Sequence, residues 1–288
     1  MLRKCTITGI PFDIGNIDDV TDYIQDALTQ NHLKTIFTPN PEILLASYQS
    51  REYQRVLASA DLSLPDGNGL LFASTFLYKT QKTHSKFLIL WKFLITYCSL
   101  VLNKSSLKKI IPQTIHGSDT LFAIHDKLQS EHIRCTYFGG SDTVQNRIQT
   151  VIEKKYPDII VAGVIGGNPQ KDDTKITEQI LKSKPDILFV ALSFPIQETW
   201  MYNHKEILEK AGIKVVIGVG GTFDFLVGNK RRAPLIMRKL GIEFLFRWII
   251  EPKRWKRIFR AVFVFPYIIL QKRLQKEADL FSIFKPLH

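Results

Sequence analysis

The sequence predicts an α/β fold, a Rossmann-like, mostly parallel sheet with helices on both faces, plus a C-terminal basic helical appendage. Short β-branched runs alternate with longer amphipathic stretches, and no internal repeat or low-complexity linker interrupts them. Each amphipathic stretch is long enough for the crossover helix that joins two parallel strands. A chain of 288 residues can bury roughly three quarters of the surface that it exposes when unfolded. It therefore has room for one large domain, with or without an appendage.

Seven apolar runs are expected as strands. They are Cys5–Ile7, Thr35–Thr38, Leu62–Leu64, Cys135–Phe138, Ile159–Val164, Ile187–Ala191 and Val215–Val219. Apolar residues recur at helical spacing in the stretches between them. These are Val20–Thr29, Glu42–Ser59, Leu121–Ser130, Val144–Lys155 and Ile176–Ser183. Such alternation is typical of a parallel sheet that is covered on both faces.

One apolar stretch, Phe87–Leu102, interrupts this alternation. It is apolar nearly all round and has about the minimum length that spans a bilayer. Lys92 lies inside it, however, and a central lysine costs a few kcal/mol on insertion scales. A buried or surface-lying helix is therefore favoured over a membrane span. We interpret the stretch as an apolar insertion near residues 86–104 of an α/β domain that covers residues 1–241.

Residues 242–288 are predicted to form a basic, amphipathic, membrane-associating appendage. Between Pro252 and Arg260 the chain carries five basic residues and no acid, with aromatic side chains at helical spacing beside them. This is the pattern of a helix that lies in the headgroup region, where each basic residue contributes roughly 1 kcal/mol near an anionic leaflet. The alternative is a solvated basic face over a core-packed stripe. The aromatic stretch Phe244–Ile250 must be covered by lipid, by core or by a second copy in a homo-oligomer.

The charge balance points to an anionic partner. With 39 Lys and Arg against 27 Asp and Glu, the chain has a net charge of +12, which suits a nucleic acid, a lipid surface or a phosphorylated substrate. No recognition helix, zinc finger or ribonucleoprotein signature supports nucleic acid. Cys5, Cys98 and Cys135 lack the spacing of a metal cage or a disulfide framework and fit a reducing cytoplasm. The first residues do not resemble a secretory signal.

The turn that contains Asp66 is the strongest local candidate for chemistry. It follows an apolar run, at the place where open α/β sheets hold their ligands. Pro65 restricts the backbone before it, and Gly67 and Gly69 permit angles and close approaches that a side chain would block. An ordinary Asp-Gly turn between a strand and a helix is the alternative.

Several short motifs follow one another along the chain. They are Thr38-Pro39-Asn40-Pro41-Glu42, Pro65-Asp66-Gly67, Gly117-Ser118-Asp119, Phe138-Gly139-Gly140, Phe194-Pro195 with Gln197-Glu198, Gly218-Val219-Gly220-Gly221-Thr222-Phe223-Asp224 and Glu251-Pro252 with Arg254. In their order and spacing the chain resembles the WecG/TagA/CpsF glycosyltransferases, family 26 of the glycosyltransferases, over nearly its whole length.

This resemblance implies a hexosyltransferase of bacterial cell-envelope polysaccharide synthesis. Its members transfer N-acetylmannosamine or its uronic acid, and in some cases glucose, from a UDP-sugar to a polyprenyl-diphosphate-linked N-acetylglucosamine. The reaction inverts the anomeric carbon and needs no metal or other cofactor. It takes place at the cytoplasmic face of the inner membrane, to which the enzyme is bound peripherally.

The resemblance also implies site residues. Asp66 corresponds to the general base, and Gln197 and Arg254 complete the catalytic set, with Gln197 steadying the donor or the leaving diphosphate. Arg247 and Arg257 are further appendage arginines that suit phosphate. Alternatives remain open: Arg254 could contact only a lipid headgroup, and Gln197 could cap the helix that carries Trp200.

Further residues are implied to bind the substrates. Thr38 and Asn40 would orient sugar hydroxyls, or else serve turn and cap chemistry. The pairs Gly139 with Gly140 and Gly220 with Gly221 would turn backbone amides toward phosphate or ribose. Asp224 would bind ribose or base, or cap a helix. The lone loop histidine His116 is assigned no role.

Two positions depart from the family pattern. Thr114 stands where an arginine is usual, so that Lys108 or Lys109 would have to substitute for it, and Ser193 stands where glycine is usual. Functions of other classes are a non-catalytic membrane-bound adaptor and a nicotinamide oxidoreductase. The latter would need an early dinucleotide fingerprint, which the sequence lacks.

Overall fold

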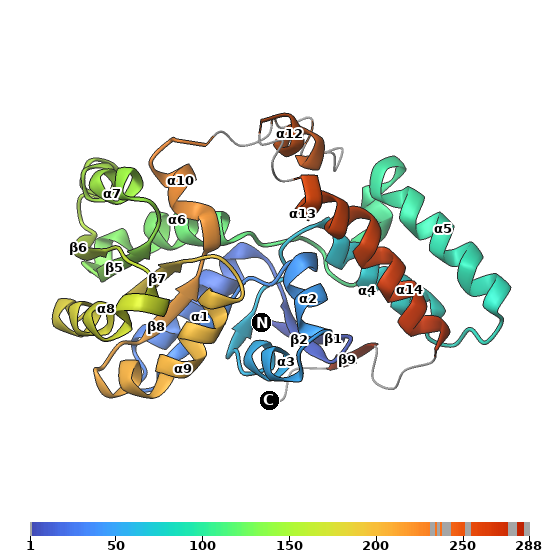
Figure 1. Ribbon diagram of the computed structural model, residues 1–288, viewed down its shortest axis with the longest axis horizontal. Helices are drawn as coiled ribbons and strands as arrows, with labels where there is room; N and C mark the ends of the chain where they lie inside the picture. Colours follow the sequence, from blue (N-terminus) through green and yellow to red (C-terminus); the bar gives the residue numbers. More distant parts are fainter. Residues whose placement is uncertain are drawn as a thin grey trace.

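The main sheet is six-stranded and entirely parallel. A computed structural model describes residues 2–230, 234, 237, 243–250, 255–275 and 281–284. The strand order is β4 (Leu62–Ser63), β3 (Lys34–Phe37), β8 (Val215–Gly218), β7 (Ile187–Ala191), β5 (Arg134–Gly139) and β6 (Ile160–Ile165). Helices lie on both sides of this sheet (Figure 1). The predicted α/β fold is confirmed.

The sheet is buried on both faces because its central strands are apolar throughout. Every residue of β7 is buried, as expected for a parallel strand between two helical layers. Ile187 and Phe189 face one core and Leu188 and Val190 face the other. One core is covered by α1 (Ile17–Leu28), α6 (Gly117–Leu128) and α7 (Asp142–Lys155). The other is covered by α3 (Arg51–Ala58), α8 (Pro169–Ser183) and α9 (Ile196–Lys210).

The stretch Glu42–Ser59, expected as one helix, forms two. α2 (Pro41–Ser47) begins at the side-chain cap of Asn40, and α3 begins at Ser50, whose side chain accepts a hydrogen bond from the backbone N–H of Tyr53. A second N-cap in mid-stretch starts a new helix direction. The single-helix expectation is therefore wrong.

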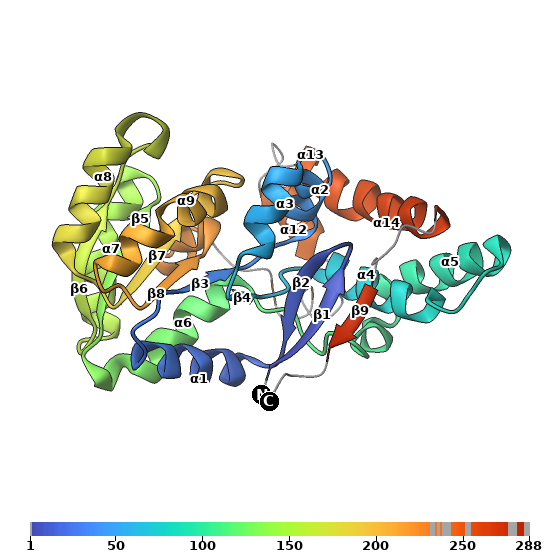
Figure 2. The ribbon, with the colours of Figure 1, turned by 90° about the horizontal axis from the view of Figure 1, so that it is seen from below.

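The first strand does not belong to the parallel sheet. β1 (Arg3–Ile7) pairs antiparallel with β2 (Ile10–Ile14) and with β9 (Phe281–Phe284) in a separate three-stranded sheet, which Figure 2 shows beside α4 (Asn68–Thr80). Thr8 and Gly9 both have positive φ, the geometry of a tight two-residue hairpin. That turn reverses the chain at once, so the expected place of Cys5–Ile7 in the main sheet is wrong.

The apolar stretch forms α5 (Lys86–Leu102), which lies along α4. The ammonium of Lys92 donates to the carbonyl of Lys79 at 2.9 Å and to the Thr83 hydroxyl at 2.8 Å. Most of the large apolar side chains of α5 are exposed, as in a surface-lying helix. Among the described residues, no helix combines the length and the hydropathy that crossing a bilayer requires.

The described parts of the C-terminal segment return to the body of the protein. They are α12 (Glu243–Ile250), α13 (Trp255–Phe259), a π-helical turn at Arg260–Val264, α14 (Phe265–Leu274) and β9. α14 packs against α4 and α5 through buried Phe265 and Ile269. The predicted domain boundary at residues 241 and 242 lies outside the described residues.

Candidate active site

Two cavities meet at the Asp66 turn. The sheet-end cavity, of about 730 Å³, lies at the carboxyl ends of β3, β7 and β8, and the α5 groove, of about 620 Å³, lies between α5 and the C-terminal helices. Six residues line both: Asn40, Asp66, His116, Ser118, Phe225 and Arg257. A group bound in one cavity can therefore reach a group bound in the other at this shared wall.

Asp66 is held at the end of β4 by backbone hydrogen bonds on both sides of the turn. The Asp66 N–H donates to the carbonyl of Pro39 at 3.1 Å, and the Ile115 N–H donates to the carbonyl of Pro65 at 2.9 Å. Gly67 follows with φ of +102°, a conformation that favours glycine. The carboxylate is about one quarter exposed and faces both cavities. This is the placement that a general base needs.

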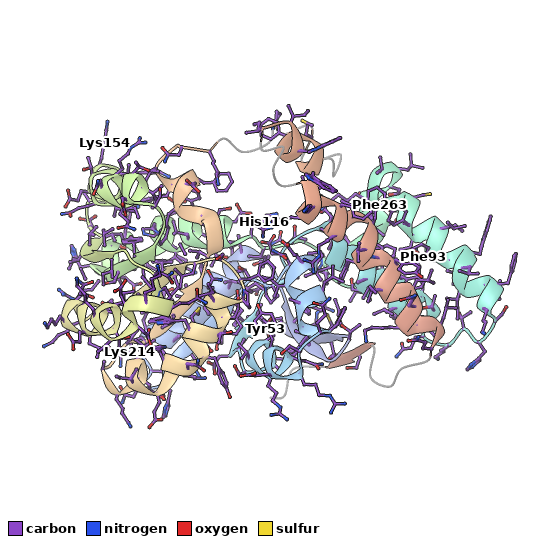
Figure 3. The ribbon with its side chains drawn as sticks, in the orientation of Figure 1. Tyr53, Phe93, His116, Lys154, Lys214 and Phe263 are labelled. Atoms are coloured by element: carbon purple, nitrogen blue, oxygen red, sulfur yellow. The ribbon has the colours of Figure 1, made fainter. Side chains whose placement is uncertain are left out.

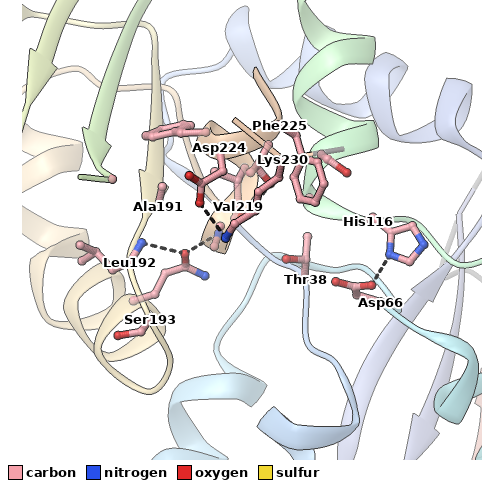
Figure 4. A pocket seen from close by; sticks show the side chains of 18 of the residues that line it. Thr38, Asp66, His116, Ala191, Leu192, Ser193, Val219, Asp224, Phe225 and Lys230 are labelled. Atoms are coloured by element: carbon pink, nitrogen blue, oxygen red, sulfur yellow. Dashed lines mark hydrogen bonds and ion pairs between the residues drawn. The ribbon is translucent and has the colours of Figure 1, made fainter. Parts of the chain in front are cut away.

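His116 is the closest partner of this carboxylate. Its Nδ1 is paired with Oδ1 of Asp66 (Figure 4). His116 precedes α6 directly, and a Cβ on the next residue, Gly117, would lie only 3.0 Å from the Cα of Val219. That close approach brings the start of α6 to the sheet end. Sequence reasoning missed His116 because the pairing spans 50 residues and leaves no local spacing signal.

Thr38 and Asn40 line the sheet-end cavity and also perform the structural roles considered as alternatives. The Thr38 hydroxyl donates to the carbonyl of Gly218 at 3.0 Å. The Asn40 side-chain oxygen caps α2, accepting from the N–H groups of Glu42 at 2.9 Å and Ile43 at 3.1 Å. These bonds fix both side chains at the rim of the site.

Gln197 is buried and joins the loops that leave β7 and β8. Its Oε1 accepts from the N–H of Gly220 at 2.8 Å and from that of Leu192 at 3.4 Å, and its Nε2 donates to Glu198 at 2.9 Å. Within the described residues no side chain caps the start of α9, so the capping alternative for Gln197 is wrong. Burial raises the pKa of Glu198, which accepts a hydrogen bond from the Tyr53 hydroxyl at 2.9 Å.

The four glycines fall into two groups. Gly140, Gly220 and Gly221 line the sheet-end cavity, and Gly140 and Gly220 have positive φ. Gly139 lies outside the lining. A Cβ there would come within 2.4 Å of the carbonyl oxygen of Ala191, so the close approach of β5 to β7 accounts for this glycine.

Asp224 is paired with a cation that sequence reasoning missed. The Lys230 ammonium lies 2.9 Å from Oδ2 of Asp224, and both side chains line the sheet-end cavity (Figure 4). The backbone N–H of Lys230 also donates to the carbonyl of Asp224 at 3.1 Å. The pair places a lysine ammonium, balanced by the Asp224 carboxylate, in the same cavity as Asp66.

Among the predicted arginines, Arg257 reaches the site. Its Nε lies 2.6 Å from Oε2 of Glu42, and its guanidinium lies over the ring of Phe194. Arg254 and the Arg247 side chain lie outside the described residues. Two other side chains of the C-terminal segment, Phe246 and Ile250, also line the sheet-end cavity. This segment therefore forms part of the site.

A sequence profile described as the Glycosyl transferase WecG/TagA/CpsF family matches residues 5–99 and 97–279. The chain belongs to this family. The two matched ranges meet inside α5, where they overlap at residues 97–99.

Curated relatives of the WecG/TagA/CpsF family match nearly the whole chain. A protein of Bacillus subtilis strain 168 is 31% identical over 88% of this chain and 86% of its own. A protein of Staphylococcus aureus strain MRSA252 is 28% identical over 96% of each chain. A third, from Bacillus spizizenii, is 29% identical over 80% of this chain and 77% of its own. All three are named N-acetylglucosaminyldiphosphoundecaprenol N-acetyl-beta-D-mannosaminyltransferase.

Thr114 stands where the WecG/TagA/CpsF family usually has an arginine, and the lysine that shares its cavity is not one of the two that were expected to substitute. Thr114 lines the α5 groove, and the lysine that lines it too is Lys104, whereas Lys108 and Lys109 line neither cavity. The Lys109 ammonium lies over the ring of Tyr78 instead, 5.3 Å from its centre. Ser193 lines the sheet-end cavity. Within the described ranges, no cluster of three His, Cys, Asp or Glu side chains could hold a metal ion.

Proposed function

We propose that this family member is an inverting glycosyltransferase. It moves an N-acetylmannosamine-type sugar, or its uronic acid, from a UDP-sugar to a polyprenyl-diphosphate-linked N-acetylglucosamine. The observation that carries the proposal is the position of Asp66 at the wall shared by two cavities. One cavity is available for each substrate, and the names of the relatives support the choice of sugar and acceptor.

The donor occupies the sheet-end cavity in this proposal. Its volume of about 730 Å³ is within the usual range for small-molecule sites. Gly140, Gly220 and Gly221 present backbone at the strand ends, where open α/β sheets bind phosphates. Lys230 and Arg257 supply positive charge for the diphosphate that leaves. Because these cations can meet the developing charge, we propose that the transfer needs no metal, so activity should persist in the presence of a chelator.

In the proposed reaction, the two substrates meet at Asp66 on the wall that the two cavities share. Asp66 takes the proton from a hydroxyl of the acceptor, and the hydroxyl oxygen forms a bond to the anomeric carbon as the bond to UDP breaks. Attack from the face opposite UDP inverts that carbon, and UDP leaves with the electron pair of the broken bond. His116, hydrogen-bonded to Asp66, holds the carboxylate in the orientation that points it at the acceptor.

The proposal includes peripheral attachment to the cytoplasmic face of the inner membrane. Exposed apolar side chains on α5 and on the C-terminal helices support it, among them Phe87, Trp91, Trp255 and Phe263. The net charge of +12 adds attraction to an anionic leaflet.

The test is to incubate the full chain with a panel of UDP-sugars and a short-chain polyprenyl-diphosphate N-acetylglucosamine, and to weigh the product. A mass gain of one N-acetylhexosamine or its uronic acid supports the main proposal, and a gain of one hexose supports a glucosyl or related hexosyl transferase.

Asp66→Asn should lower turnover by about 10²- to 10⁴-fold with UDP binding retained. Asp158→Asn, at an exposed turn, is the control. Near-native turnover of Asp66→Asn would overturn the assignment, and no heat on adding any UDP-sugar would favour an adaptor.

A further inference from the structure

The α5 groove is polar at one end and apolar at the other. At the Asp66 turn, on the wall that it shares with the sheet-end cavity, it is lined by Asn40, Ser118 and Arg257. Farther away its walls are apolar, formed on the α5 side by Tyr97, Leu100 and Val101 and on the C-terminal side by Ile258, Val262 and Phe263. Figure 3 places His116 between the part of the molecule that holds the parallel sheet and the part that holds Phe93 and Phe263. The change from polar to apolar therefore runs away from the reacting carboxylate.

We propose that this groove binds the first isoprenoid units of the acceptor lipid, with its diphosphate at Lys104. The inference rests on the function proposed above and adds a subsite to it. An acceptor of this class has its sugar, its diphosphate and its apolar chain in that order, which matches the order of the groove from Asp66 outward. The lipid chain is thus recognised by the protein, separately from the bilayer.

The two walls of the groove are joined, so they form one site. The Tyr97 hydroxyl of α5 donates to the carbonyl of Val262 at 3.1 Å. Tyr97 also stacks on Phe93, and both rings meet Phe72 edge to face. Val262 belongs to the π-helical turn Arg260–Val264, an irregularity that is frequent at functional sites. In the same turn, Ala261 presents a small side chain to the groove.

Lys104 and Arg257 are the lysine and the arginine that line the groove. Glu42 is paired with Arg257, and Asp66 with His116. Asp119 also lines the groove, in the first turn of α6. Lys104 begins the short helix η1 (Lys104–Leu107) after α5 and lines the groove together with Thr114. A lysine here supplies the positive charge that the family pattern places on an arginine at position 114.

The test measures transfer in solution without vesicles. The acceptors are N-acetylglucosamine diphosphates that carry either three isoprenoid units or a single methyl group. We expect the isoprenoid acceptor to have a KM about ten- to a hundredfold lower. Leu100→Glu and Ala261→Trp, which charge or fill the groove, should remove most of this difference. Lys104→Gln should raise the KM of both acceptors about tenfold, and Lys104→Arg should restore it.

Leu94→Glu is the matched control, because Leu94 is exposed on α5 and does not line the groove. It should leave the acceptor KM in solution unchanged. The KM of the UDP-sugar and the melting temperature are followed in every variant to show that the donor cavity and the fold persist. Equal KM values for the two acceptors in the wild-type protein would overturn the groove and leave the transferase function standing. No transfer to either acceptor with any UDP-sugar would instead overturn the function.

Discussion

The contact between His116 and Asp66 joins two loops that are 50 residues apart. A carboxylate on a glycine-flanked turn can rotate, whereas one that accepts a hydrogen bond from a fixed ring is held in one orientation. His116 is itself fixed by its place directly before α6. In the proposed mechanism, the pair therefore orients the base before the acceptor arrives.

His116→Ala should lower kcat about ten- to a hundredfold, since the base loses its orienting partner. The KM of the UDP-sugar should change little. His116→Asn offers a side-chain N–H near the position of Nδ1 and should recover part of the loss. Steady-state kinetics with saturating donor measure this. Equal kcat values for the alanine variant and the wild type would show that the pairing does not serve catalysis.

Because His125 is buried, we expect the stability of the fold to depend on pH. Its ring is buried against Tyr137 and Phe189, and burial lowers its pKa from 6.5 to about 4. The folded state then binds fewer protons than the unfolded state between these values, so stability falls as pH falls below 6.5. Between pH 6.5 and 5 we expect a loss of about 1.5 kcal/mol. Urea unfolding of the wild type and of His125→Phe measures it, and identical pH slopes would contradict the assignment.

At the scale of single residues, the sequence predicts a functional role where that role depends on neighbours in the chain. Asp66 is recognisable because Pro65 and Gly67 shape its turn locally. His116 and Lys230 could not be predicted from the residues, because each gains its role from a partner brought close only by folding or from the cavity it lines. The Arg254 prediction lies outside the described residues and stays a prediction.

At the scale of elements, the close approach between the carboxyl ends of β5 and β7 depends on one glycine, Gly139. Gly139→Ala would place a Cβ within 2.4 Å of the Ala191 carbonyl oxygen, in backbone with φ of +107°. We expect a loss of about 3 kcal/mol or more. Gly212→Ala is the control, since its φ is +83° but nothing lies within 4 Å of its Cβ, and it should cost about 1 kcal/mol. Urea unfolding compares the two, and equal losses would show that the close approach is not the cause.

Arg273 fastens α14 to the end of α4. It is 9% exposed, and its Nη2 donates to the carbonyls of Thr80 at 2.6 Å and Thr83 at 2.7 Å. Arg273→Gln should destabilise the fold by about 2–4 kcal/mol, because the buried carbonyl of Thr80 and the half-buried one of Thr83 lose a charged donor. Lys256→Gln removes the same charge from an exposed position of α13 and should stay within about 0.5 kcal/mol. Thermal unfolding checks both, and an unchanged Arg273→Gln would contradict the role.

The elements that the sequence predicts well are those whose pattern is local. Buried parallel strands such as β7 read as continuous apolar runs. β2 was not predicted because Pro11 and Asp13 interrupt its apolar pattern. β9 has four residues, and its partner β1 lies at the other end of the chain. Pairing over such a separation leaves no periodic signal.

For the molecule as a whole, exposed apolar side chains gather on α5 and on the C-terminal helices, and α14 packs beside α5 (Figure 1). The fold class was predictable because alternation of strands and helices is a global pattern. The meeting of two cavities was not, since it depends on the C-terminal segment crossing back over the sheet end.

Membrane binding should depend on this face of the molecule. Trp91→Glu places a charge on the exposed face of α5 and should reduce partitioning onto anionic vesicles about tenfold. High salt should weaken binding of the wild type, because screening shortens the reach of its net positive charge. Flotation of vesicles measures both. Tyr202→Glu, exposed on α9, is the control, and equal partitioning of the two variants would contradict α5 as a contact surface.

The return of the chain to β1 constrains how substrates can enter and leave. β9 is hydrogen-bonded to the N-terminal hairpin, and α14 is fastened to α4, so the C-terminal segment is anchored downstream of the site as well as upstream. The segment is thus attached to the body of the protein on both sides of the site. Under the proposed function, UDP therefore leaves and a new donor enters past a segment that is held on both sides of the site.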